Sequence, residues 1–339
     1  MDKSFDDIGG TFVPPQERGC LSDDTLSYYN DAPKIDASQL LEKGIEFYQI
    51  REFSGALYAF KQALAIFRDT QDLQKEGKTL SGLGLVYYAL GDYNRAVTYS
   101  YQGLAIARQT LDRFTEHQAL ANLGNAYRHC KDYARGIEYT QKSLDVARDI
   151  QSRRGELSAL SNLGMVYKAM GHCYKAIDYY KASLAIAREI HDRYLESQVL
   201  RNLGNAYHVL GDYDKMIECY EDVLNSIRCI PDRRTEMQLL KNLGSICAMA
   251  GKPDCAIQYH HQRLAIAREL HDLNHEEQAL ENLGILYDAS GDYIKALDYH
   301  EQRLHVAQTI QNSELESRVR RSLKTICYAM GDYKRAYKY

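Results

Sequence analysis

The sequence predicts an all-α protein built as a solenoid of antiparallel helix pairs. Glycine recurs at a fixed interval, a second glycine follows seven residues later in most units, and the apolar residues between them have helical spacing. Self-similarity at a period of about 20–50 residues is typical of stacked repeats, in which each unit contacts only its neighbours. The glycines of the first column, each 40 residues from the next, are Gly44, Gly84, Gly124, Gly164, Gly204, Gly244 and Gly284.

Each unit predicts two helices that pack on each other. In one unit Leu120, Leu123 and Tyr127 share a helix face with the column glycine, and Leu144 and Ala147 form the apolar side of the following stretch. Such a hairpin cannot bury its apolar face alone and becomes stable only when neighbouring units stack on it. Four cysteines stand in tyrosine columns, where we expect them to pack as small apolar residues: Cys173, Cys219, Cys247 and Cys327.

A glycine-aspartate pair marks the turn between the two helices of most units. In Gly91-Asp92-Tyr93 the glycine can adopt the left-handed conformation that ends a helix, and the aspartate can cap the next one. Lys131 replaces this glycine in one unit, a departure that we expect to cost little. The helices are therefore expected near 73–90 and 93–110, and at the same offsets in the other units.

The period divides the chain into two parts. Residues 1–34 break it and hold seven acidic against three basic residues, so we expect an acidic, disordered N-terminal tail. Residues 35–339 form an array of about eight 40-residue units. The last unit, from about Ser313, is incomplete at Tyr339, and its uncapped end is a candidate surface for self-association.

Composition and motifs argue against several classes of function. The net charge is only −4, so we expect no nucleic-acid partner, and no segment is apolar enough for direct membrane insertion. Together with a first stretch unlike a secretory signal, this predicts a cytoplasmic protein. The sequence has no C-x-x-C pair, phosphate-binding loop, nucleophile elbow or H-E-x-x-H motif. We therefore expect no enzyme, no catalytic residue, no metal and no cofactor.

The recurring Leu-Gly-x-x-Tyr and Gly-Asp-Tyr columns resemble tetratricopeptide repeats over about residues 38–339. This resemblance implies a right-handed superhelix. The period is longer than the usual 34 or so residues, which adds about 9 Å of helix per unit. Runs such as residues 202–207 and 264–268 resemble the long repeats of Pins-type spindle-orientation adaptors and of bacterial, especially cyanobacterial, arrays. In the Pins-type family the inner groove binds extended peptides, which implies a groove here. An arginine column replaces the usual repeat-ending proline: Arg108, Arg148, Arg188, Arg228 and Arg268.

In such a superhelix the first helix of each pair lines the groove, which leaves the columns that begin at 78, 81, 85 and 88 free to touch a partner. Between Arg128 and Lys241 these columns are basic, and an asparagine column runs beside them. Asparagine amides can hold a peptide backbone, although they can equally bond to the neighbouring repeat. The candidate partner-binding residues are Asn122, Asn125, Arg128, Asn162, Lys168, Arg201, Asn202, Asn205, His208, Lys241 and Asn242.

These residues predict a scaffold or adaptor whose groove binds an extended, acidic segment of another protein. The alternative is an assembly factor or co-chaperone that captures the C-terminal tail of a client. Such a clamp needs cations gathered around one carboxylate, and a partial version is present in Arg201, Asn202, Asn205, Lys241 and Asn242.

Overall fold

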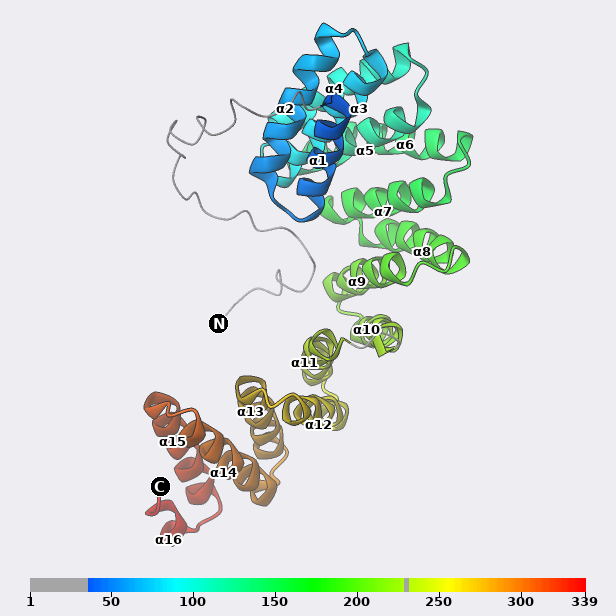
Figure 1. Cartoon of the computed structure of the whole chain (residues 1–339). Coiled ribbons are helices and arrows are strands. Elements are labelled where there is room, and N and C mark those ends of the chain that lie inside the picture. Colours follow the sequence, from blue (N-terminus) through cyan, green and yellow to red (C-terminus); the bar gives the residue numbers. More distant parts are fainter. Residues whose placement is uncertain (1–35, 229–231) are drawn as a thin grey trace, which may run out of the picture. The chain divides into compact units, whose positions relative to one another are not determined.

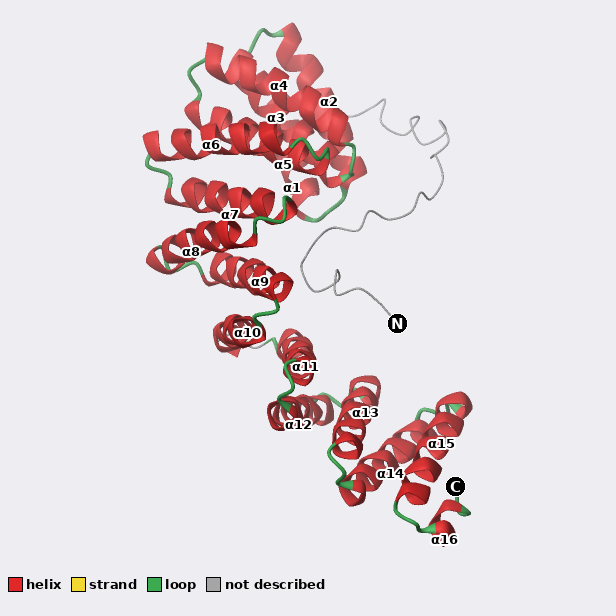
Figure 2. Ribbon diagram, turned by 180° about the vertical axis from the view of Figure 1, so that it is seen from behind, coloured by secondary structure: helices red, strands yellow, loops and turns green. Residues whose placement is uncertain are grey.

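The computed structural model describes residues 36–228 and 232–339, which form two compact units divided between Asn202 and Leu203. In this part of the chain all regular structure is helical, with short loops between the helices (Figure 2). The sixteen helices are α1 (Ala37–Gln49), α2 (Phe53–Asp69), α3 (Leu73–Ala89), α4 (Tyr93–Gln109), α5 (Arg113–His129), α6 (Tyr133–Asp149), α7 (Arg153–Ala169), α8 (Cys173–Glu189), α9 (Arg193–Leu210), α10 (Tyr213–Arg228), α11 (Arg233–Met249), α12 (Pro253–Glu269), α13 (Leu273–Ala289), α14 (Tyr293–Thr309), α15 (Ser313–Ala329) and α16 (Tyr333–Ala336).

The first unit holds α1 to α8 and the beginning of α9. From α1 to α8 each helix packs against the one that follows it, and α1, α3, α5 and α7 also pack side by side (Figure 1). The odd-numbered helices therefore share one side of this unit, as predicted for the first helix of each pair. The second unit continues the same order, with consecutive packing from α10 to α16. The chain is thus an α-solenoid of antiparallel helix pairs, which confirms the predicted fold class.

A close contact between each column glycine and the residue sixteen positions later joins the helices of the first seven described pairs. A Cβ atom on Gly164 would lie 2.6 Å from the Tyr180 ring, and one on Gly244 would lie 2.5 Å from His260. Only glycine leaves room for these side chains, which confirms the predicted close approach of paired helices. The opposing residues, all buried, are Phe60, Ser100, Thr140, Tyr180, Tyr220, His260 and His300. The four cysteines in tyrosine columns are buried too.

Both kinds of turn in the array use one residue in the left-handed region. Between the two helices of a pair it is usually glycine, as at Gly91 with φ 80°, and Lys131 adopts φ 60° in the same place. Between successive pairs the residue is never glycine in the described turns, and Leu111 with φ 56° is one example. The first kind of turn was predicted from the glycine-aspartate pairs. The second kind has no glycine to mark it.

The arginine column forms a repeated ion pair across the second kind of turn. Arg108 Nε lies 2.9 Å from Glu116 Oε1, and the same pair, eight residues apart, recurs from Arg68 to Arg268. In three of the described 40-residue repeats a second arginine binds the same carboxylate, as Arg233 does with Glu236 at 2.8 Å. Burial would raise the pKa of Glu236, but hydrogen bonds from its two arginines outweigh that effect and lower it. The arginines that replace the family's proline therefore tie successive pairs together.

The predicted tail, residues 1–34, lies outside the described residues. Among the helices of the described part, none combines the length and apolar character that a bilayer span requires.

The glycine turn allows a test with two opposite substitutions. We expect Lys131→Gly to raise the free energy of unfolding by about 1 kcal/mol, because glycine removes the left-handed strain of a residue that carries a Cβ. Gly91→Ala should lower it by a similar amount, since the space around Gly91 is open and only the backbone conformation is penalised. Urea unfolding followed by circular dichroism measures both changes. Shifts of the same sign would contradict the assignment of the cost to φ.

The buried histidines predict acid sensitivity. Burial lowers the pKa of His260 and His300 from 6.5 to about 4, and neighbouring arginines add to the effect. A histidine with a lower pKa when folded binds fewer protons in the folded state, so acid favours the unfolded chain. Each of the two histidines should lower the free energy of unfolding by up to about 3 kcal/mol between pH 7 and pH 4.

The matched control for this effect is phenylalanine, because Phe60 fills the same column against Gly44. The variant His260→Phe/His300→Phe should lose less stability than the wild type between pH 7 and pH 4.5 in urea unfolding. Parallel pH profiles for the two proteins would show that other groups cause the acid sensitivity.

Candidate functional site

We call the columns that begin at 78, 81, 85 and 88 on the odd-numbered helices the inner face. In the first unit this face contains a hollow of about 730 Å³, lined by residues of α1, α3, α5 and α7. Lys78, Ser81 and Leu85 of α3 line it, together with the equivalent Gln118 and Ala121 of α5. The columns predicted to be free of packing therefore do line an open surface here.

The hollow is more apolar than the sequence analysis predicted. Leu41 and Ile45 of α1 line it beside Leu85, and Phe114 at the start of α5 adds an exposed ring. The repeat period could have predicted this apolar lining. Leu41 and Ile45 stand 40 residues before Ser81 and Leu85, in columns of the inner face. The predicted sites concentrated on the basic columns, and Asn122 alone among them lines the hollow.

Asn122 bonds to the neighbouring repeat rather than pointing free into the groove. Its side-chain amide donates to the carbonyl oxygen of Ser81 on α3 over 3.1 Å. This is the structural role that the sequence left open for the asparagine column. Asn125, one turn later on α5, differs because its buried Oδ1 has no hydrogen-bond partner in the described part of the chain.

Arg128 belongs to an aromatic cluster at the end of α5. Its guanidinium donates to the Tyr88 hydroxyl over 3.2 Å and lies 2.8 Å from His129 Nε2, while Tyr93 stacks on the His129 ring at 4.5 Å. Burial and the charge of Arg128 lower the pKa of His129 to about 4, so this imidazole is neutral near pH 7. Half-buried Arg128 is thus held in place, with its Nε buried and unpartnered in the described structure.

The other candidates in the first unit lie on α7 and α9. Asn162 and Lys168 are half-buried on α7, and Arg201 and Asn202 are half-buried on α9. The Nε atom of Arg201 is buried and, among the described residues, has no hydrogen-bond partner. Two of the candidate arginines, Arg128 and Arg201, therefore each contain one buried donor without an acceptor in the described structure.

The remaining candidates belong to the second unit. Asn205 Oδ1 accepts a hydrogen bond from the Tyr220 hydroxyl over 3.3 Å, and His208 contacts the edge of Tyr213. On α11 Lys241 and Asn242 are half-buried, and Asn242 Oδ1 accepts from Gln238 Nε2 over 3.2 Å. Two of the asparagine oxygens are therefore already engaged by the chain itself.

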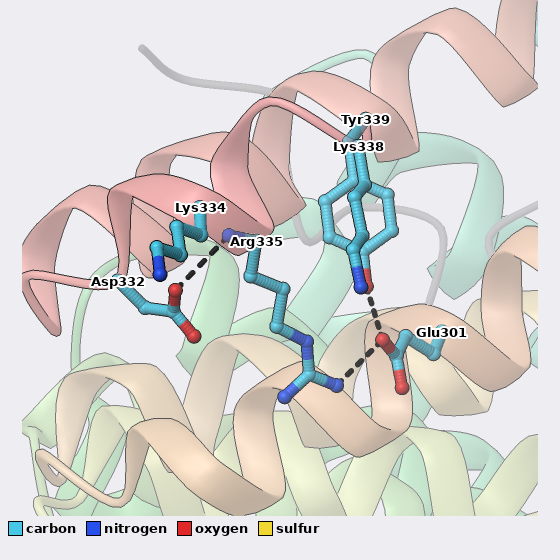
Figure 3. A pocket seen from close by; sticks show the side chains of 6 residues that line it. All are labelled: Glu301, Asp332, Lys334, Arg335, Lys338 and Tyr339. Carbon is cyan, nitrogen blue, oxygen red and sulfur yellow. Dashed lines mark hydrogen bonds and ion pairs between the residues drawn. The ribbon is translucent and has the colours of Figure 1, made fainter.

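A polar hollow of about 480 Å³ lies at the last described helix (Figure 3). Glu301 of α14 accepts from Arg335 over 2.7 Å and from the Tyr339 hydroxyl, and Asp332 caps the backbone of Arg335. Tyr259 donates to Glu221 in the same relation as Tyr339 to Glu301. This region thus continues the repeat contact, and both carboxylates of the hollow are engaged internally.

Tandem helix pairs with an open inner face define the class of helical-repeat interaction proteins. The chain belongs to the tetratricopeptide repeat family, whose models, described as Tetratricopeptide repeat, match residues 78–119, 115–189, 195–269 and 235–309. This confirms the predicted resemblance. Such repeats commonly act as non-catalytic scaffolds, and membership of the family supports protein-interaction scaffolding as the general role of this chain. No curated protein sequence matches the chain.

Solved structures show the same fold at low sequence identity. The chain is similar to a signal transduction ATPase with a tetratricopeptide repeat sensor from Pyrococcus horikoshii, with TM-score 0.60, 16% identity, and 89% of this chain and 46% of that chain covered. It is also similar to the apo form of RapI, with TM-score 0.55, 14% identity, and coverage of 82% and 99%. Aspartyl phosphate phosphatase F from Bacillus subtilis has TM-score 0.52, 14% identity, and coverage of 87% and 95%.

The asparagine column can be tested inside one unit. Asn122→Ala should lower the free energy of unfolding by about 1 kcal/mol, because it removes the bond to the Ser81 carbonyl. Asn162→Ala is the matched control, since this equivalent residue of α7 makes no such bond in the described structure, and its change should be smaller. Chemical denaturation measures both. Equal losses would mean that the bond to Ser81 contributes nothing specific.

Proposed function

We propose that this protein is a scaffold or adaptor whose inner face binds an extended, acidic segment of a partner protein. The observation that carries the proposal is a set of half-buried cations on the odd-numbered helices α5, α7, α9 and α11: Arg128, Lys168, Arg201 and Lys241. Two of them, Arg128 and Arg201, hold a buried Nε without a partner in the described structure, so an incoming carboxylate can satisfy a donor that the chain does not. Charge-assisted bonds of this kind are stronger than neutral ones.

The apolar hollow of the first unit adds a second requirement for the partner. Because Leu41, Ile45, Leu85 and Phe114 leave apolar surface open, the bound segment should carry apolar side chains beside its acidic ones. Burial of such anchors supplies affinity, whereas the cations supply selectivity for an acidic sequence.

The capture of a client C-terminal tail is the second candidate function. It needs amides and cations that are free to surround one terminal carboxylate. Asn205 and Asn242 instead have their side-chain oxygens engaged by Tyr220 and Gln238. These bonds engage the oxygens and not the Nδ2–H donors that a carboxylate binds, so they do not decide between the two functions. A peptide tested with a free and with an amidated C-terminus separates the two functions, because only a clamp distinguishes them strongly.

Charge reversal tests the proposed acidic partner. Arg201→Glu/Lys241→Glu should weaken binding of a fluorescent, amidated Glu-Leu repeat peptide by about tenfold or more, measured by fluorescence anisotropy at fixed ionic strength. Lys61→Glu/Lys181→Glu is the matched control, because it changes net charge equally at exposed positions of the even-numbered helices α2 and α8. Unchanged binding in the first variant, or equal losses in both, would reject an acidic-peptide site on the inner face.

A further inference from the structure

Two arginines of the second unit occupy the same place in successive repeats. Arg263 of α12 and Arg303 of α14 stand 40 residues apart, within the repeated sequence Tyr-His-x-Gln-Arg-Leu. Both residues are buried, with exposed fractions of 0% and 2% for the whole residue. Their hairpins have equal helix lengths and the same glycine turn, at Gly251 and Gly291. The two sites can therefore be compared position by position.

Arg303 has the partners that a buried guanidinium requires. Its Nε and one terminal nitrogen lie 2.7 and 2.6 Å from Glu277 Oε1, and the same terminal nitrogen lies 2.7 Å from Glu281 Oε1. The Glu281 side chain is 35% exposed although the arginine side chain is only 3% exposed. The carboxylate that satisfies this buried cation thus lies at the surface of the inner face, where solvent reaches it.

Arg263 lacks both carboxylates. The residues 40 positions before Glu277 and Glu281 are Met237 and Lys241, an apolar group and a second cation. Arg263 donates from one terminal nitrogen to Gln278 Oε1 over 2.7 Å, while its Nε and other terminal nitrogen are buried without a partner in the described structure. Burial lowers its pKa to about 10, and Asp272 and Glu277 oppose this through space. A buried cation with unsatisfied donors is unfavourable for the free protein.

We propose that Arg263 and Lys241 form a carboxylate subsite, which receives an aspartate or glutamate side chain of the bound partner. The incoming carboxylate binds Arg263 as Glu281 binds Arg303. It replaces the oxygen of half-buried Gln278, which is the neutral acceptor of Arg263 in the free protein. A carboxylate is favoured over a phosphate as the ligand, because in the next repeat glutamate side chains bind the equivalent arginine, Arg303. The inference rests on the proposed acidic partner and names where one of its acidic groups binds.

The test supplies Arg263 with a carboxylate from the protein itself, at the position equivalent to Glu277. Met237→Glu should supply Arg263 with the carboxylate that Glu277 gives Arg303, whereas Met237→Gln adds a side chain of the same size without charge. With the full chain and the amidated Glu-Leu repeat peptide, Met237→Glu should bind about tenfold more weakly than Met237→Gln at fixed ionic strength. It should also unfold at a higher temperature than Met237→Gln, because Arg263 gains an internal partner.

Arg263→Ser is the second variant, since Ser143 and Ser183 occupy this column in earlier repeats, and it should weaken binding to the same extent. Equal affinity and equal unfolding temperature of Met237→Glu and Met237→Gln would overturn the subsite. Arg201→Glu, in the other unit, tests the acidic partner separately. If Arg201→Glu weakens peptide binding but Met237→Glu and Arg263→Ser do not, only the subsite is overturned. If none of the three variants weakens peptide binding, the proposed function is overturned.

Discussion

The fold depends on how closely the two helices of each pair approach at the column glycine. A Cβ atom on Gly244 would come within 2.5 Å of the His260 ring, so a larger residue would displace that side chain from its place against the first helix. Every 40 residues the same close approach fixes how the second helix lies on the first. It thereby decides which columns of the odd-numbered helix are buried in the hairpin and which remain on the inner face. The open surface is a consequence of this packing, and the proposed partner binding depends on it.

Local and periodic features could be predicted from the sequence. Helix pairs and glycine turns follow from one repeat copied in step, and the structure confirms them; in the first compact unit the columns of the inner face also line a hollow. Partners across repeats could not be predicted in this way. Nothing local in Arg108 indicates that it binds Glu116 across a turn without glycine, and nothing local in Asn122 shows that its amide reaches the Ser81 carbonyl. Such contacts depend on how far successive pairs are rotated and shifted, which the period alone does not give.

The chemistry of the open surface in the first unit differs from the predicted basic groove. Of the candidate residues only Asn122 lines the hollow, Arg128 is held by Tyr88 and His129, and the hollow is apolar. The charged residues of the columns indicated a basic groove, whereas Leu41 and Ile45 make the hollow apolar. Apolar residues at regular spacing are expected to be core in a solenoid, so an apolar position on the open face can be recognised only after packing has assigned the buried columns.

A repeat protein offers an internal reference that a single domain lacks, because each unit shows how the same position is satisfied elsewhere. By that standard Arg263 is exceptional. Desolvation of a guanidinium is costly, and Arg303 offsets the cost with two glutamates. Arg263 has Gln278, and Lys241 stands at the repeat position of Glu281. Serine or valine fills the column in the three preceding repeats, so packing does not demand arginine there. A charge that neither packing nor an internal partner explains is better understood as part of a recognition surface, whose cost in the free protein is recovered when a ligand supplies the missing acceptor.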